Sequence, residues 1–206
     1  MVQVVIVRHG QTDHNQQGIM QGLLDVPLNE LGTRQAQAVA HWLGCRYRFD
    51  HIYTSNLQRA DRTAQFIAEQ QSCPVVAERA LREINVGVWQ GLTYPEAQQA
   101  DPKLWQRLLD DPMNTPRPNG ESYADVYQRV TDWWRQTIEP LTDEVCCVVT
   151  HGIPIRAILA YALAVDPAES GLRLSLDNTG VSTLDYDRKH SRWLVHTINA
   201  TCHLGQ

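Results

Sequence analysis

Apolar runs alternate with amphipathic segments along most of this chain. Residues 2–7 form a short run rich in β-branched side chains, which is typical of a strand buried on both faces of a sheet. Residues 29–44 instead repeat apolar positions at spacings of three and four, with Asn29 in front and Gly44 at the end, which predicts a helix. A strand followed by a helix in this way is typical of an α/β fold.

Further strands are predicted from similar apolar runs. The segments concerned are residues 51–55, 74–76, 145–150, 181–186 and 193–198, the last two joined by a polar turn at 187–192. Helical patterns separate most of these runs. Because strands that alternate with helices pair in parallel, we expect a largely parallel sheet covered by helices on both faces.

Two of the predicted helices begin at recognisable residues. Asn56 is a suitable N-cap for a helix that ends near Glu69. The clearest helix follows Gly120-Glu121-Ser122, and its apolar stripe, which includes Trp133 and Trp134, is typical of core packing. A third helix is expected after residue 152, with Pro154 in its first turn.

Residues 92–120 break this alternation. They are polar, contain five prolines and predict only short helical pieces. We interpret them as an insertion over the strand ends that acts as a lid or specificity cap, although a plain surface excursion fits the length and composition equally well. No repeat or domain boundary is visible, so we expect a single domain over residues 1–206 with its cap insertion at about 92–120.

The composition and charge of the chain limit the kinds of molecule that it is expected to bind. The chain has 206 residues, 43% of them hydrophobic, and a formal net charge of -5, which argues against a nucleic-acid or anionic-membrane surface. An anionic small substrate is still compatible, because a few arginines can bind it locally. The five cysteines show no C-x-x-C spacing, and no secretory signal or membrane-spanning stretch is apparent. We therefore expect reduced thiols and a cytoplasmic location.

Two His-Gly pairs follow predicted strands. Arg8-His9-Gly10 ends the first apolar run, and His151-Gly152 ends the run at residues 145–150. The carboxyl ends of strands in an open α/β sheet are where ligands bind, so both imidazoles are expected at one site, with Gly10 permitting the turn after the strand. A neutral histidine beside cations can attack phosphorus, which indicates phosphoryl transfer through His9. The alternative is a core histidine bonded to backbone.

Three further positions suit the same chemistry, each with a structural alternative. Arg59 lies in the first turn of a predicted helix, where a guanidinium can bind an anion or simply form a surface salt bridge. Glu83 could donate a proton to an alkoxide leaving group, or it could be an exposed glutamate paired with Arg82. His151 could donate a hydrogen bond to phosphoryl oxygens, and the backbone N–H of Gly152 could approach the same anion.

Rival chemistries lack their motifs in this sequence. The eight histidines include no H-x-H or H-x-x-x-H, and there is no Cys/His ladder that would indicate a metal site. The phosphate-binding loops G-x-x-x-x-G-K-[ST] and G-x-G-x-x-G and the nucleophile elbow G-x-S-x-G are also absent.

Taken in order, the motifs of the chain resemble the histidine phosphatase superfamily of phosphoglycerate-mutase-like proteins. The resemblance spans nearly the whole chain and rests on these blocks: Arg8-His9-Gly10-Gln11-Thr12-x-x-Asn15, Gln21-Gly22, Thr54-Ser55-x-Leu57-x-Arg59-Ala60-x-x-Thr63-Ala64, Leu81-Arg82-Glu83, Gly120-Glu121-Ser122, Val149-Thr150-His151-Gly152 and Asn178-x-Gly180-Val181-Ser182. No single block is specific, but their order is.

The resemblance implies a fold and a role for each matching residue. The implied fold is a three-layer α/β/α sandwich, and the implied activity needs no metal or organic cofactor. His9 would be the phosphorylated nucleophile and Glu83 the proton donor and then the base. The remaining site residues would bind the phosphoryl group and border the substrate, and they are Arg8, Arg59, His151, Asn15, Gln21 and Gly22.

The superfamily contains mutases and phosphatases, and this chain is more similar to the phosphatases. Cofactor-dependent phosphoglycerate mutases have His-Tyr soon after the acid block, whereas Glu83 here precedes Ile84-Asn85-Val86, and the cap segment is brief. We expect a phosphomonoesterase acting on a small phosphorylated metabolite, with Tyr94, Trp105 and Arg117 as candidate cap residues. A phosphoglycerate mutase and a silent phosphate-binding or regulatory protein are the alternatives, and a homodimer is left open.

Overall fold

The computed structural model describes residues 1–205, and the side chains of these residues apart from 170–172. Within them lies one sheet with the strand order β3-β2-β4-β1-β5-β6. The strands are β1 Val2–Arg8, β2 His51–Ser55, β3 Val75–Glu78, β4 Val145–Thr150, β5 Val181–Asp187 and β6 Arg192–Ala200. The first four in spatial order pair in parallel, whereas β5 is antiparallel to both β1 and β6. The predicted largely parallel sheet is confirmed.

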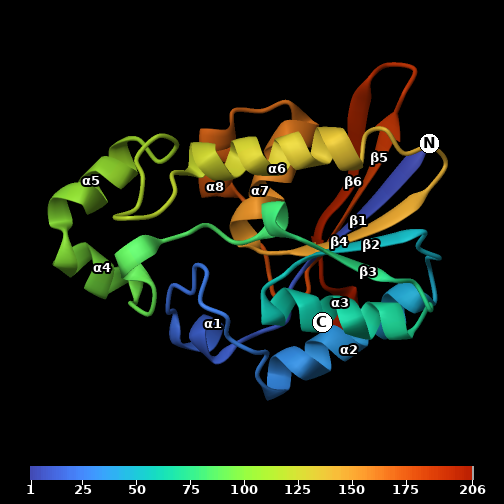
Figure 1. The fold of residues 1–206 in the computed structure, drawn as a ribbon, viewed down its shortest axis with the longest axis horizontal. Helices are drawn as coiled ribbons and strands as arrows, with labels where there is room; N and C mark the ends of the chain where they lie inside the picture. Colours follow the sequence, from blue (N-terminus) through green and yellow to red (C-terminus); the bar gives the residue numbers. More distant parts are fainter. Residues whose placement is uncertain (206) are drawn as a thin grey trace.

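Helices cover both faces of this sheet (Figure 1). The helices α2, Glu30–Gly44, and α3, Gln58–Glu69, pack on one face, while α6, Tyr123–Thr137, and α7, Gly152–Leu163, pack on the other. Side chains of β1 alternate between the two layers, with Val4 and Ile6 in the core under α6 and α7 and Val5 and Val7 in the core over α2 and α3. The architecture is the three-layer α/β/α sandwich.

Shorter elements connect these layers. They are α1 Asp13–Gln17, α4 Tyr94–Ala100, α5 Pro102–Asp110, α8 Pro167–Arg173 and the 3₁₀ turns Arg79–Leu81, Gly87–Trp89 and Cys202–Leu204. Figure 1 shows α4 and α5 projecting beyond one end of the sheet, and both belong to residues 92–120, where short helical pieces were expected. Ala97 of α4 and Leu104 of α5 join the core under α6. None of the helices in residues 1–205 is both long and apolar enough to cross a membrane.

The expected start of α3 is wrong by one residue. Leu57, not Asn56, is the N-cap, and it forms no side-chain capping bond. The side-chain oxygen of Asn56 instead accepts a hydrogen bond from Arg82 Nε at 2.6 Å, while Leu57 N–H donates to Ser55 Oγ at 3.3 Å. Asn56 therefore serves a contact between two loops, which local capping preference could not indicate.

Gly10 has a different role from the expected turn. A Cβ on Gly10 would lie 2.4 Å from the carbonyl oxygen of Gly32 in the first turn of α2, and a Cβ on Gly32 would lie 1.9 Å from the carbonyl oxygen of Gln11. The two glycines therefore allow the loop after β1 to pack directly against the backbone of α2. This contact fixes the position of the residue before it, His9.

Backbone hydrogen bonds hold the end of β1 from both sides. His9 N–H donates to Thr150 O in β4 at 3.0 Å, and Thr179 N–H donates to Arg8 O at 3.0 Å. The side-chain amide of Asn178 adds a bond to His9 O at 2.9 Å. Because β1, β2 and β4 are parallel, their carboxyl ends meet at one edge of the sheet, where the site described next is built.

Candidate active site

The two imidazoles predicted to converge do so. The ring centroids of His9 and His151 are 5.0 Å apart, with the ring planes inclined by 58°. Their side chains are 2% and 0% exposed, respectively. Each follows the last residue of a central parallel strand, so adjacent strands of the sheet bring together residues that are far apart in sequence.

The environment of His9 keeps its ring neutral and defines the tautomer. Burial lowers the pKa of His9 well below 6.5, and the nearby guanidinium groups of Arg59 and Arg8 lower it further. The ring nitrogen Nδ1 lies 2.7 Å from Gly10 O, and a carbonyl can only accept, so Nδ1 carries the proton. The remaining nitrogen, Nε2, therefore presents a lone pair, which a nucleophile requires.

The ring of His151 is held through its other nitrogen, Nε2, whereas that of His9 is held through Nδ1. Its Nε2 lies 2.8 Å from Ser55 Oγ, and that hydroxyl oxygen already accepts a bond from Leu57 N–H. With Ser55 as the donor to Nε2, the hydrogen of the neutral ring lies on Nδ1. Burial, Arg59 and His9 lower the pKa of His151 well below 6.5. Within residues 1–205 its buried Nδ1 has no hydrogen-bond partner, so this N–H can donate to a bound anion.

Two arginines supply positive charge beside the imidazoles. Arg59, 1% exposed, donates from Nη1 to Leu24 O at 2.8 Å and from Nη2 to Gly22 O at 2.9 Å, which also holds the loop carrying Gln21 and Gly22. Arg8 donates from Nη1 to Leu176 O at 2.5 Å. Burial lowers the pKa of Arg59 to about 10, so the side chain remains a cation at neutral pH. The Nε atoms of both arginines are buried without a partner among the described residues.

The carboxylate of Glu83 lies at the amino terminus of α7. Its Oε1 accepts from the backbone N–H groups of Ile84 at 2.9 Å and Ile153 at 3.3 Å. The alternative pairing of Glu83 with Arg82 is wrong, because Arg82 bonds to Asn56 instead. A Cβ on Gly152 would lie 3.8 Å from Glu83 Oε2, so Gly152 borders this carboxylate, and it is not among the residues that line the pocket described below.

An ion pair between Arg129 of α6 and Glu121, which precedes the helix, holds the segment that carries Glu83. Arg129 donates from Nη1 to Ala80 O at 2.6 Å and from Nη2 to Glu83 O at 3.1 Å, and its Nε lies 3.0 Å from Glu121 Oε1. The second oxygen of Glu121 accepts from Asn85 N–H at 2.8 Å. The pair thus bonds the backbone on both sides of Glu83. Sequence reasoning missed Arg129, whose place on the buried side of α6 gave no chemical signal.

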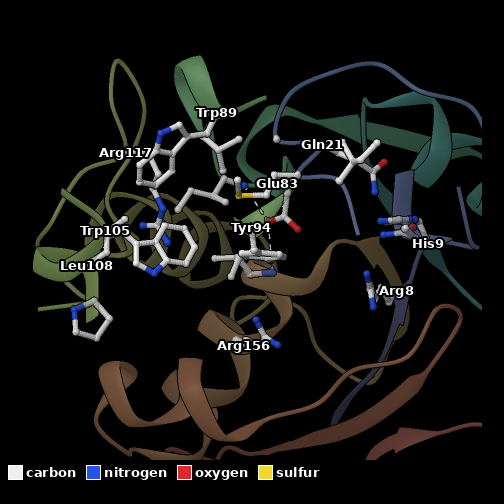
Figure 2. Close-up of a pocket in the computed structure, with 18 of the residues that line it drawn as sticks. Arg8, His9, Gln21, Glu83, Trp89, Tyr94, Trp105, Leu108, Arg117 and Arg156 are labelled. Atoms are coloured by element: carbon white, nitrogen blue, oxygen red, sulfur yellow. Dashed lines mark hydrogen bonds between the residues drawn. The ribbon is translucent and has the colours of Figure 1, made fainter. Parts of the chain in front are cut away.

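One pocket of about 380 Å³ lies next to these side chains, and His151, whose ring lies beside that of His9, is not among the residues that line it (Figure 2). Of the predicted site residues, it is lined by Arg8, His9, Asn15, Gln21, Gly22, Arg59 and Glu83. The candidate cap residues Tyr94, Trp105 and Arg117 also line it. Arg156, on the first turns of α7, lines it as well and was missed, although its position four residues after Gly152 could have indicated it.

The pocket is built for an anion. Four arginines, one carboxylate and one neutral imidazole line it, so the net charge of the lining favours a negatively charged ligand. No cluster of three or more His, Cys, Asp or Glu side chains suited to a metal ion occurs in the described part of the chain. A nucleophile, a proton donor and cations around one cavity are the parts that phosphoryl transfer requires.

Comparisons with known proteins agree with this geometry. A family model described as histidine phosphatase superfamily (branch 1) matches residues 4–201. Phosphoserine phosphatase 1 of Hydrogenobacter thermophilus is 33% identical over 206 residues, covering 100% of this chain and 96% of that protein.

Two solved structures are similar over nearly their full length. A phosphoserine phosphatase from Entamoeba histolytica, in complex with 3-phosphoglyceric acid, has a TM-score of 0.87 at 28% identity and covers 99% of this chain and 100% of its own. A mycobacterial glucosyl-3-phosphoglycerate phosphatase has a TM-score of 0.81 at 35% identity, over 96% of this chain and 98% of its own.

Proposed function

Because this chain belongs to the histidine phosphatase superfamily (branch 1) and is a phosphoric monoester hydrolase, we propose that it releases phosphate from small phosphorylated metabolites through a phosphohistidine on His9. The observation that carries the proposal is the neutral His9 ring, with its Nε2 lone pair, which lines one pocket with Arg8, Arg59 and Glu83 and lies beside the ring of His151. Neither a metal nor an organic cofactor takes part in the proposed steps.

In the first step, His9 Nε2 attacks phosphorus and the bond from phosphorus to the ester oxygen breaks. The Glu83 carboxyl gives its proton to the departing alkoxide, so an alcohol leaves and phosphohistidine remains. In the second step, water attacks phosphorus, Glu83 takes a proton from that water, and the bond from phosphorus to Nε2 breaks. Inorganic phosphate leaves, and both groups return to their starting protonation states.

Fixed donors would stabilise the negative charge on the phosphoryl oxygens in both steps. Arg8 and Arg59 supply guanidinium N–H groups, and His151 supplies its Nδ1–H. The side-chain oxygen of Asn15 is occupied by Thr12 N–H at 3.2 Å, so Asn15 would contribute its amide N–H. Since these groups are held by other hydrogen bonds, little reorganisation is needed when the transition state forms.

Hydrolysis is favoured over the two alternatives. A phosphoglycerate mutase is disfavoured by the residues after Glu83, where the His-Tyr pair typical of those mutases is replaced by Ile84-Asn85-Val86. A silent phosphate-binding protein would have no use for an acid–base group such as the Glu83 carboxyl inside a cation-rich pocket. As part of the same proposal, the enzyme acts in the cytoplasm as a single domain with a cap at about residues 92–120, and it needs neither nucleic acid nor a membrane.

A screen for phosphate release from a panel of phosphorylated metabolites tests the proposal. The wild type should release phosphate from at least one ester, and rapid quenching should trap an acid-labile phosphoryl group on the protein. His9→Ala should lose both, whereas His41→Ala, on the exposed side of α2, should keep both. Wild-type turnover by His9→Ala, or isomerisation of 3-phosphoglycerate faster than phosphate release, would contradict the proposal.

A further inference from the structure

The pocket has two chemically different ends. Figure 2 shows His9 and Arg8 on one side, Arg117, Trp105 and Leu108 on the other, and Glu83 between them. The first end holds the groups that act on phosphorus. The second end is formed by the cap and by residues next to it, so it faces whatever is attached to the phosphoryl group.

Arg117 is a cation that the proposed reaction does not use. Its Nη1 is buried without a hydrogen-bond partner among residues 1–205. Its side chain also takes part in none of the ion pairs within that range. Glu83 and Glu121 both lie close enough to affect it electrostatically, Glu83 more strongly, but neither forms an ion pair with it: Glu83 accepts from backbone N–H groups, and Glu121 is bonded to Arg129. A buried guanidinium nitrogen without a hydrogen-bond partner costs free energy, so an acceptor supplied by the ligand would explain its presence.

The surroundings of Arg117 are apolar and aromatic. The rings of Trp89 and Trp105 have centroids 5.7 Å apart, and Leu108, Leu109 and Pro112 complete the wall on this side. The pocket has a volume of about 380 Å³. A phosphoryl group fills a minor part of this space, so the pocket accommodates a leaving group with a sizeable apolar body.

We infer that the natural leaving group has an apolar, aromatic body that packs against Trp89 and Trp105 and a carboxylate at its far end that binds Arg117. The substrate class is thus a phosphomonoester whose second anionic group is separated from the phosphate by a flat apolar spacer. Arg117 sets specificity, and Trp105 supports the spacer. This inference rests on the proposed phosphatase function and names the substrate class for the same pocket.

Matched synthetic esters isolate the contribution of Arg117. The substrates are 4-(2-carboxyethyl)phenyl phosphate and its neutral carboxamide, which have nearly the same size and the same phenol leaving group. The measured quantity is the ratio of kcat/KM for the carboxylate to kcat/KM for the carboxamide. We expect a ratio of about ten to a hundred for the wild type, the size expected of a hydrogen bond to a charged group.

Variants then assign that ratio to one side chain. Arg117→Gln should bring the ratio close to one, and Arg117→Lys should restore part of it, because lysine keeps the charge but loses the fork. Arg107→Gln, an exposed arginine on the same cap that does not line the pocket, should leave the ratio unchanged. A general loss of activity cancels in the ratio, so a partly destabilised variant is still informative.

Each outcome bears on a different claim. A wild-type ratio near one, or an unchanged ratio in Arg117→Gln, would overturn the inference even if both esters are hydrolysed. Preference for phosphoserine over both aryl esters would also overturn it, since the carboxylate of phosphoserine lies close to its phosphate. Failure of the wild type to release phosphate from any ester, with no phosphoryl group trapped on His9, would instead refute the proposed function.

Discussion

Replacing Arg129 by methionine should lower both stability and catalytic efficiency, because Glu83 would be displaced although no residue that lines the pocket is changed. The guanidinium bonds Ala80 O, Glu83 O and the carboxylate of Glu121, and it is not among the residues that line the cavity. Methionine retains much of the apolar stem but none of these bonds. The segment around Glu83 then keeps its other bonds, which include those to the amino terminus of α7, to Glu121 and from Thr150 to Leu81 O.

The stability cost can be bracketed from exposure. The side chains of Arg129 and Glu121 are 24% and 26% exposed, so the pair lies between the exposed and the fully buried limits. Exposed pairs contribute about 0–1 kcal/mol, whereas removing one partner of a buried pair costs about 3–5 kcal/mol. We therefore expect Arg129→Met to lower the free energy of unfolding by about 2–3 kcal/mol, measured by urea denaturation.

The catalytic cost should depend on the leaving group. Complete loss of a general acid costs about 10²–10⁴ in rate, and a misplaced carboxyl retains part of that, so kcat/KM for an alkyl phosphate should fall about tenfold to a hundredfold. The value for 4-nitrophenyl phosphate should fall far less, because nitrophenolate leaves without a proton. Glu83→Gln should show the same selectivity with a larger loss on the alkyl ester.

A control on the same helix separates positioning from general damage. Arg135→Met removes an exposed arginine of α6 whose guanidinium lies 4.7 Å from the ring of Tyr161, well away from Glu83. This variant should change kcat/KM for either ester by no more than about twofold. Equal losses on the alkyl and nitrophenyl esters in Arg129→Met would refute the positioning role. An alkyl phosphate rate equal to that of the wild type, in a folded variant, would do the same.

Three other predictions follow from the site and its supports. The pKa values of His9 and His151 lie below 6.5 in the folded protein, so the unfolded chain binds more protons than the folded protein at mildly acidic pH. The free energy of unfolding should therefore keep its full value above about pH 6.5 and decrease below that pH, by at most about 1.4 kcal/mol per pH unit for each ring. A series of denaturant titrations at different pH values that shows no steeper decrease for the wild type than for a variant lacking both rings would exclude this. Gly32→Ala should lower the free energy of unfolding by about 1–3 kcal/mol, because its Cβ would clash with Gln11 O. Leu31→Ala, at the exposed neighbouring position, should lower it much less, and thermal denaturation of both variants measures the difference. Phosphate release should be unchanged by a strong chelator, because His9 and the arginines supply the nucleophile and the positive charge; loss of activity that added metal restores would contradict this.

The layered fold could be predicted because its strands are continuous apolar runs and its helices have regular spacing. The helix α1 escaped notice because its five residues are too few to show a period, although Thr12 and Asn15 form its capping box. The convergence of His9 and His151 could also be predicted, since parallel strands end at one edge of a sheet.

The supports of the site could not be predicted, because they depend on contacts between distant segments. The hydrogen bond from Ser55 to His151 joins residues 96 apart in sequence, and the bond from Arg129 to Glu83 O joins residues 46 apart. Neither pair has a spacing that local periodicity detects. The orientation of Arg117 into the pocket likewise depends on how residues 92–120 fold, which their proline-rich composition does not specify.

The place of β1 in the sheet has a consequence for the synthesis of the protein. Of the six strands, β1 is synthesised first, and it pairs only with β4 and β5, whose residues begin at Val145 and Val181. The apolar residues of β1 therefore stay unpaired until β4 and β5 have been translated, and pairings so distant in sequence form slowly. Activity should therefore not appear before β5 has been synthesised.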